Sequence, residues 1–346
     1  MFLENLNDNK YKVFFFINDT GGKYHEAVEY IYQLAYGYKS SGIETYILHE
    51  KDEYTIPSGI DYQGKYSQLE HLSFSKMASM QMKISHEDFI FIPDVYLEFI
   101  SQLKEQMIPA EFIIIIQNIN VIFDMLEMGQ NIYQLGVRQV IVPDQAVKDY
   151  MEEYFTFHTN PKMSTTFHTL TPFVEDIYKS GGTISKPQIL LTDGRSISYE
   201  RFVKKFYLKF PHYGWIPFKV MDDSDIIQSR NDIMESAFIV SFNEGILCGQ
   251  RMMQAVSCGK KVLTKKFEVR PVWTYGLEND IIEVSSSLEE AVAHTFDYYL
   301  SGGELDKEGD RVFSYLYFME NFKSVAENIK NNRIEFLNAV NEKQKK

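Results

Sequence analysis

Residues 244–264 hold the side chains best suited to chemistry. They read EGILCGQRMMQAVSCGKKVLT and follow a short apolar run at 238–242 that predicts a buried strand. We expect a helix to begin beside Arg251, with Gln254 on the face of its first turns. A helix N-terminus next to an arginine attracts anions, because its unpaired backbone N–H groups and the guanidinium both carry positive charge. The segment therefore predicts a site for a phosphate-bearing ligand.

The composition limits the classes of protein that can hold such a site. A chain of 346 residues with 45% hydrophobic residues is long and apolar enough for two buried cores. The net charge of −13 argues against a sequence-independent grip on nucleic acid, although a local basic groove can lie on an acidic protein. Only two cysteines, no signal-like leader in MFLENLNDNK and no apolar run of membrane-spanning length predict a cytoplasmic protein without a transmembrane segment.

Strand and helix patterns alternate along most of the chain. Residues 11–50 read as strand, glycine-containing loop, helix and strand, and three more strand–helix pairs follow between 88 and 155. Residues 50–87 predict a loop with a short helix, and 156–187 have the Thr, Ser, Gly and Pro content of a linker. A second alternating series begins at 187. The predicted fold class is therefore α/β, with two tandem doubly wound, Rossmann-like domains.

This order of elements resembles that of the GT-B glycosyltransferases, in particular the group 1 type, over nearly the whole chain. The likeness is sharpest to their nucleotide-sugar motif, a Glu-Gly turn followed by a helix reading roughly Arg-x-x-Glu-Ala-x-Ala-Cys-Gly-x-x-Val-x-Thr. The matching residues are Glu244, Gly245, Arg251, Gln254, Ala255, Cys258, Gly259, Val262 and Thr264. The resemblance implies an acceptor-side domain at 1–170 facing a nucleotide-sugar-binding domain at 171–320 across a cleft. A C-terminal helix at 321–346 would cross back to the first domain.

The resemblance also implies which residues bind the sugar donor. The segment TDGRSIS resembles the family's Gly-Arg turn, whose arginine reaches the donor diphosphate. The implied donor-binding residues are Gly194, Arg195, Glu244, Gly245, Arg251 and Gln254. Both arginines would neutralise the leaving diphosphate as the glycosidic bond breaks; the alternative is that they are surface residues capping loops. Gln254 departs from the family, where a glutamate is usual, but its amide can still accept and donate hydrogen bonds.

The acceptor side is expected at the front of the chain. The segment NDTGGKYHEAV resembles the family's first glycine-rich turn, and we assign Gly21, Gly22 and Asn118 to the acceptor-side loops. A catalytic base would lie at the carboxyl end of a first-domain strand, where Asp94 is the first candidate, followed by Asp19 and His25. A retaining mechanism needs no such base, so the stereochemical outcome stays open.

We therefore expect transfer of a sugar from a nucleoside diphosphate sugar, a UDP-sugar first of all, to a hydroxyl of a glycan, a lipid-linked or another acceptor. No metal-ligand spacing occurs, and we expect no metal and no further cofactor. Two alternatives remain open: a phage-type DNA glycosyltransferase acting on hydroxymethylated bases, and a non-catalytic GT-B-like partner subunit. Residues 199–215 mix lysines with aromatics, which allows peripheral membrane contact, although a covering helix and a buried strand are the more usual interpretation.

Overall fold

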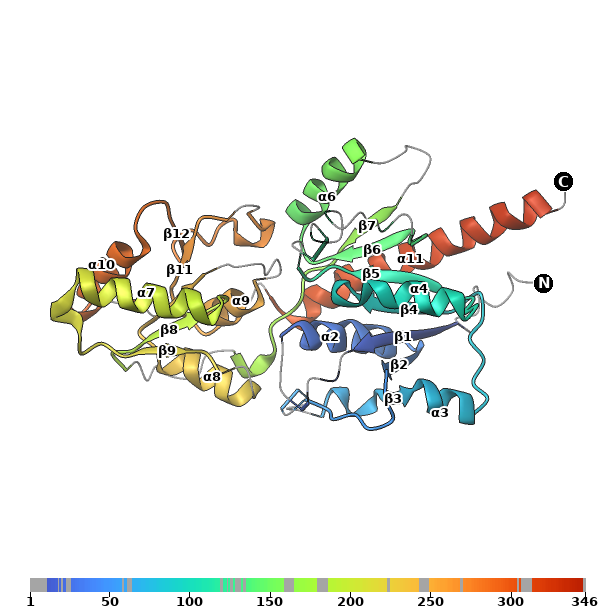
Figure 1. Cartoon of the computed structure of the whole chain (residues 1–346), viewed down its shortest axis with the longest axis horizontal. Helices are drawn as coiled ribbons and strands as arrows, with labels where there is room; N and C mark the ends of the chain where they lie inside the picture. The colour runs from blue at the N-terminus through green and yellow to red at the C-terminus, as the bar shows by residue number, and fades with distance from the viewer. Residues whose placement is uncertain are drawn as a thin grey trace. The chain divides into compact units, whose positions relative to one another are not determined.

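The protein folds into two compact units, each built around one parallel sheet (Figure 1). The computed structural model describes residues 11–17, 19, 21–22, 26–57, 59–60, 64–118, 121–122, 124, 127, 132, 135–158, 165–178, 186–222, 225–242, 249–267, 270–303, 305 and 313–344. The first unit contains the described residues up to Thr171 together with the chain from Phe318 onward. The second unit runs from Pro172 to Tyr317.

The first unit holds a seven-stranded sheet in the order β3-β2-β1-β4-β5-β6-β7, with every neighbouring pair parallel. Its strands are β1 (Lys12–Ile17), β2 (Glu44–His49), β3 (Glu70–Ser73), β4 (Phe89–Pro93), β5 (Glu111–Ile115), β6 (Gln139–Val142) and β7 (Thr166–Thr169). Its helices are α2 (Glu26–Ser40), α3 (Phe74–Ser79), α4 (Leu97–Glu105), α6 (Gln145–His158) and most of α11 (Tyr315–Gln344), with 3-10 turns at η1 (Tyr66–Gln68) and η2 (Asp94–Tyr96). Every residue of β4, β5 and β6 is buried, as continuous apolar strands covered on both faces require.

The second unit holds a five-stranded parallel sheet in the order β12-β11-β10-β8-β9. Its strands are β8 (Ile189–Thr192), β9 (Phe218–Val220), β10 (Phe238–Ser241), β11 (Val262–Lys265) and β12 (Ile281–Val284). Its helices are α7 (Ser196–Lys209), α8 (Ile226–Glu235), α9 (Gln250–Ser257) and α10 (Leu288–Leu300), with 3-10 turns at η3 (Asp176–Tyr178), η4 (Pro211–Tyr213) and η5 (Val272–Thr274). Phe206, Phe238 and Phe296 lie at the centre of its apolar core.

Two strands depart from the sequence expectations. Residues 50–87 contain β3, and the segment expected to be a linker contains β7. Each pairs along one side only, at an edge of the seven-stranded sheet. Both are four residues long and carry polar side chains, as EHLS and TFHT. Short polar edge strands lack the apolar run that identifies a central parallel strand, so the pattern gave no indication of them.

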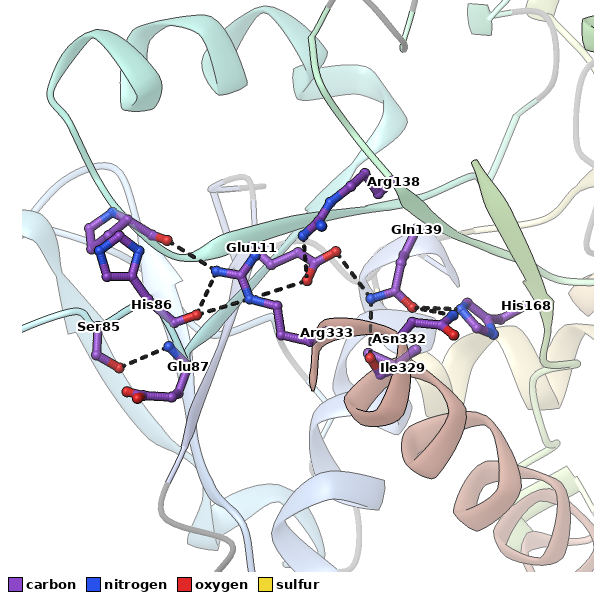
Figure 2. A network of polar contacts seen from close by, with 11 residues as sticks. Ser85, His86, Glu87, Glu111, Arg138, Gln139, His168, Ile329, Asn332 and Arg333 are labelled. Atoms are coloured by element: carbon purple, nitrogen blue, oxygen red, sulfur yellow. Dashed lines mark hydrogen bonds and ion pairs between the residues drawn. The ribbon is translucent and has the colours of Figure 1, made fainter. Parts of the chain in front are cut away.

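A buried polar network fastens α11 to the amino ends of β5 and β6 in the first unit (Figure 2). Glu111, which is 5% exposed, forms ion pairs with Arg138 Nη2 at 3.1 Å and with Arg333 Nε at 3.4 Å. The same Arg333 nitrogen donates to the carbonyl oxygen of His86 at 2.9 Å. Gln139 Nε2 donates to Glu111 Oε1 and to the α11 carbonyl of Ile329, each at 3.1 Å. The last helix is therefore held by charge and by hydrogen bonds at the amino edge of the sheet.

We expect Arg333→Ala to lower the free energy of unfolding by about 3–5 kcal/mol, because it leaves part of the Glu111 charge buried without its partner. Urea unfolding of the full chain measures this change. Lys343→Ala, which removes an exposed cation from the same helix, is the matched control and should change stability by less than about 0.5 kcal/mol. Equal effects of the two substitutions would contradict a stabilising role for the network.

Candidate functional site

Each sheet has one point where the strand order reverses. In the first unit β1 leads to β2 and β3 on one side, whereas β4 lies on the other side of β1. In the second unit β8 leads to β9 on one side, whereas β10 lies on the other. Loops leave such neighbouring strands in opposite directions and open a crevice at their carboxyl ends, where open α/β sheets bind ligands. The residues after β1, β4, β8 and β10 are therefore the candidates for function.

Asp193 joins the carboxyl ends of β8 and β10. Its φ of +56° is uncommon for a residue other than glycine, and aspartate tolerates it better than most. Its Oδ2 accepts hydrogen bonds from Thr192 Oγ1 at 2.9 Å and from Ser241 Oγ at 2.7 Å. These bonds hold the turn from which the chain enters Gly194 and Arg195.

Gly194 packs against Phe242, the residue that follows β10. A Cβ at position 194 would lie 2.9 Å from Phe242 Cβ and 2.9 Å from Tyr199 Cε1. The Gly194 backbone N–H also donates to the Tyr199 hydroxyl at 2.8 Å. Packing alone therefore explains the glycine. It places Arg195 at the N-cap of α7, exposed and without a capping hydrogen bond from its side chain.

Helix α9 is buried along its whole length, although half of its eight residues are polar. The polar residues are Gln250, Arg251, Gln254 and Ser257. Arg251, which is 4% exposed, donates from Nη1 to Gln254 Oε1 at 3.1 Å. Gly249 begins the helix with a φ of +57°, and a Cβ there would lie 2.6 Å from Trp273 Cζ2. The structure thus brings Arg251 and Gln254 together and orients the guanidinium through the amide.

Lys265 is a cation of this edge that the sequence analysis missed. It is the exposed last residue of β11, and its Nζ lies 5.1 Å from the centre of the Phe242 ring. The strand order places β8, which leads to Arg195, and β11, which ends at Lys265, on either side of β10. Gly194 packs on the same phenylalanine. The sequence does contain a signal for this residue, because Lys265 directly ends an apolar strand. Glu244 and Gly245 lie outside the described residues.

Asp94 follows β4 in the first unit and is 1% exposed. Its Oδ2 accepts the backbone N–H groups of Gln117 at 2.8 Å and of Asn118 at 2.6 Å, both just after β5. Its Oδ1 is buried without a hydrogen-bond partner in the described part of the chain. Burial raises the pKa of Asp94 to about 6, because loss of hydration disfavours the carboxylate more than the neighbouring N–H groups favour it. The structure therefore brings two of the predicted site residues, Asp94 and Asn118, into direct contact through a hydrogen bond.

The glycine turn after β1 is organised by Asp19. The Gly21 backbone N–H donates to Asp19 Oδ1 at 2.9 Å, and Gly21 and Gly22 have φ values of +64° and +81°. Aspartate readily forms such turns, and glycine adopts positive φ without steric cost. Asp19 and Gly21 are exposed, so this turn is available to a ligand. His25 lies outside the described residues.

Two neighbouring histidines at this edge, His49 and His71, also escaped the sequence analysis. His49 ends β2, and its Nε2 lies 2.8 Å from His71 Nδ1. Tyr54 stacks on His49 with ring centres 3.8 Å apart. Burial is the main reason that the pKa of each histidine is lowered to about 4. Lys76 contributes to both shifts, and His71 also lowers the pKa of His49. The pair is therefore neutral at pH 7.

No group of three or more His, Cys, Asp or Glu side chains in the described ranges is placed to hold a metal ion. Among the helices that the structure describes, none combines the length and apolar character that a membrane crossing requires.

The raised pKa of Asp94 makes stability depend on pH. Between about pH 4 and pH 6 the folded protein binds this proton more tightly than the unfolded chain does, so the free energy of unfolding falls as the pH rises through that window. Relative to Asp94→Asn, which has no titrating group, we expect wild type to lose about 1–3 kcal/mol between pH 4 and pH 7. Urea unfolding of both proteins across this range measures the difference, and a pH-independent difference would contradict the raised pKa.

Known proteins resemble this chain in fold and not in sequence. Scans against models of protein families and against curated proteins find no match. Sucrose-phosphate synthase from Thermosynechococcus elongatus matches with a TM-score of 0.55 and 10% identity, over 95% of this chain and 99% of that one. The pneumococcal O-GlcNAc transferase GtfA, in complex with UDP and GlcNAc, matches with a TM-score of 0.53 and 9% identity, over 96% and 99%.

An alpha-glucosyltransferase in complex with UDP and a 13-mer DNA containing an HMU base matches with a TM-score of 0.51 and 12% identity, over 94% of this chain and 99% of that one. These three glycosyltransferases match along nearly their full length, and so does this chain. At this level of identity the likeness concerns the fold. The chain has the GT-B glycosyltransferase fold, made of two Rossmann-like domains.

Proposed function

We propose that this chain is a glycosyltransferase that takes a sugar from a nucleoside diphosphate sugar, with UDP as the nucleotide, and passes it to a hydroxyl acceptor. The observation that carries the proposal is the set of cations at the carboxyl edge of the second sheet: Arg195 after β8, Lys265 at the end of β11, and Arg251 in α9. The fold supports it, since the GtfA and alpha-glucosyltransferase structures with the same fold contain UDP.

The cations fit the charge that develops on the leaving group. When the bond between the sugar and the diphosphate breaks, the diphosphate oxygen keeps the electron pair and becomes more negative. Arg195 and Lys265 are exposed and offer charge-assisted hydrogen bonds, and the N-terminus of α7 adds its dipole beside Arg195. Arg251 contributes a guanidinium whose orientation is fixed by Gln254. Such fixed donors stabilise the departing diphosphate without reorganising during the reaction.

Asp94 is our candidate for the acceptor-side base. In that role its carboxylate takes the proton of the acceptor hydroxyl while the acceptor oxygen bonds to the sugar carbon. A pKa of about 6 leaves Asp94 mostly ionised at neutral pH and more basic than an ordinary aspartate. Oδ2 is occupied by the N–H groups of Gln117 and Asn118, so Oδ1 is the oxygen that would receive the proton.

The donor half of the proposal is tested by UDP affinity. Arg251→Ala and Arg195→Ala should each weaken UDP binding by about 10- to 100-fold, because each removes a charge-assisted hydrogen bond worth about 1.5–3 kcal/mol. Titration calorimetry with UDP measures the affinity, and thermal unfolding checks that each variant is folded. Lys323→Ala removes an exposed cation from the first unit and is the control. UDP binding that survives both arginine substitutions unchanged would refute the donor site.

The acceptor half is tested by Asp94→Asn. The asparagine oxygen can still accept the two backbone N–H groups, so the substitution keeps the loop and removes only the base. Transfer from a UDP-sugar should fall about 100-fold or more, while UDP affinity stays within about twofold. Turnover is followed by release of UDP. Nearly full transfer by this variant would assign Asp94 to loop positioning instead, and no turnover by wild type with any nucleotide sugar would favour a non-catalytic subunit.

A further inference from the structure

Helix α7 carries a basic stripe on the face that points away from its sheet. Phe202 and Phe206 on one side of the helix are buried in the core of the second unit. On the opposite side, side chains recur at intervals of three and four residues, which places them along one line of the helix surface. This α7 stripe consists of Ile197, Arg201, Lys204, Lys205 and Leu208, and all five residues are exposed.

The three cations of the α7 stripe form no ion pair with any residue that the structure describes. Other exposed lysines of the second unit do have acidic partners: Lys209 Nζ lies 2.5 Å from Glu290 Oε1, and Lys186 Nζ lies 2.7 Å from Glu235 Oε2. The whole chain has a net charge of −13. Glu200 of the same helix is the exposed acid beside them, so these three cations leave this face with a net positive charge on an otherwise acidic protein, which favours contact with an anionic partner.

Large apolar side chains accompany this charge. Ile197 is 52% exposed near the first turn of α7, and Leu208 is 74% exposed in the last turn. Trp215, 56% exposed, lies close to the same last turn, because the Tyr207 hydroxyl donates to the carbonyl oxygen of the next residue, Ile216, at 2.5 Å. Leucine and tryptophan beside lysines are typical of helices that lie in a membrane interface.

We propose that the α7 stripe, together with Trp215, docks the protein onto an anionic lipid surface. The helix would lie parallel to the membrane, with Arg201, Lys204 and Lys205 at the phosphate level and with Leu208 and Trp215 entering the headgroup region. Nucleic acid is the less suitable occupant, since exposed aliphatic side chains at both ends of the stripe gain nothing from a phosphate backbone. The proposal concerns an outer face of the second unit and is independent of whether the chain is an enzyme.

Vesicle co-sedimentation of the full chain tests this surface. We expect binding to vesicles of phosphatidylcholine mixed with phosphatidylglycerol, little binding to phosphatidylcholine alone, and weakening at high salt. The triple variant R201Q/K204Q/K205Q should lose about 100-fold in affinity, because each of the three cations near an anionic membrane contributes about fivefold. The matched control K51Q/K323Q/K343Q removes three exposed cations elsewhere and should bind as wild type does.

Tryptophan fluorescence separates docking from a general attraction between polyanions and cations. Entry of Trp215 into the headgroup region should shift the emission to shorter wavelength, and Trp215→Phe should abolish the shift while Trp273 remains. Leu208→Gln should weaken binding without changing its dependence on salt. Equal binding by the two triple variants, no shift with anionic vesicles, or binding to duplex DNA of at least the same affinity as to the vesicles would each overturn the proposal.

Discussion

The parallel pairing of the two sheets is the constraint on which the candidate sites depend. Parallel strands with right-handed crossovers end on one edge of a sheet, and a reversal of strand order opens that edge to a ligand. In the first unit this edge holds Asp94 beside the end of β5, and in the second it holds Arg195 beside the end of β10. The Glu111–Arg333 network that fastens α11 lies at the opposite, amino edge of its sheet. In the first unit the stabilising network and the candidate site therefore lie at opposite ends of the strands.

The two edges carry different ionisable groups. Burial holds a carboxyl group in the first unit at a pKa of about 6, so that it binds a proton more tightly than an ordinary aspartate does. The second unit collects cations, one of which is oriented by the Gln254 amide. Sugar transfer needs both properties, since a proton leaves the acceptor while negative charge grows on the diphosphate. The cations of the second unit carry the donor half of the proposed function, and the raised pKa of Asp94 supports the acceptor half.

The sequence predicted the architecture better than the details of the candidate site. Long apolar strands and amphipathic helices identified two α/β domains, because burial on both faces leaves a clear pattern. The edge strands β3 and β7 escaped because four polar residues carry no such pattern. Lys265, His49 and His71 escaped because their proximity to other candidates is created by strand order. The burial of Asp94 and the pairing of Arg251 with Gln254 likewise arise only from tertiary packing.

Hydrogen exchange of the full chain with and without UDP is the most direct test of the central claim, that the second unit binds a nucleoside diphosphate at its strand-order reversal. The account predicts slower exchange of backbone amides at 194–199, the start of α7, and at 249–257 in α9, with α11 from residue 318 onward unchanged. Bound ligand lowers the population of locally open states only where it binds or where binding is coupled. Unchanged exchange in both segments at saturating UDP, or protection confined to the first unit, would contradict it.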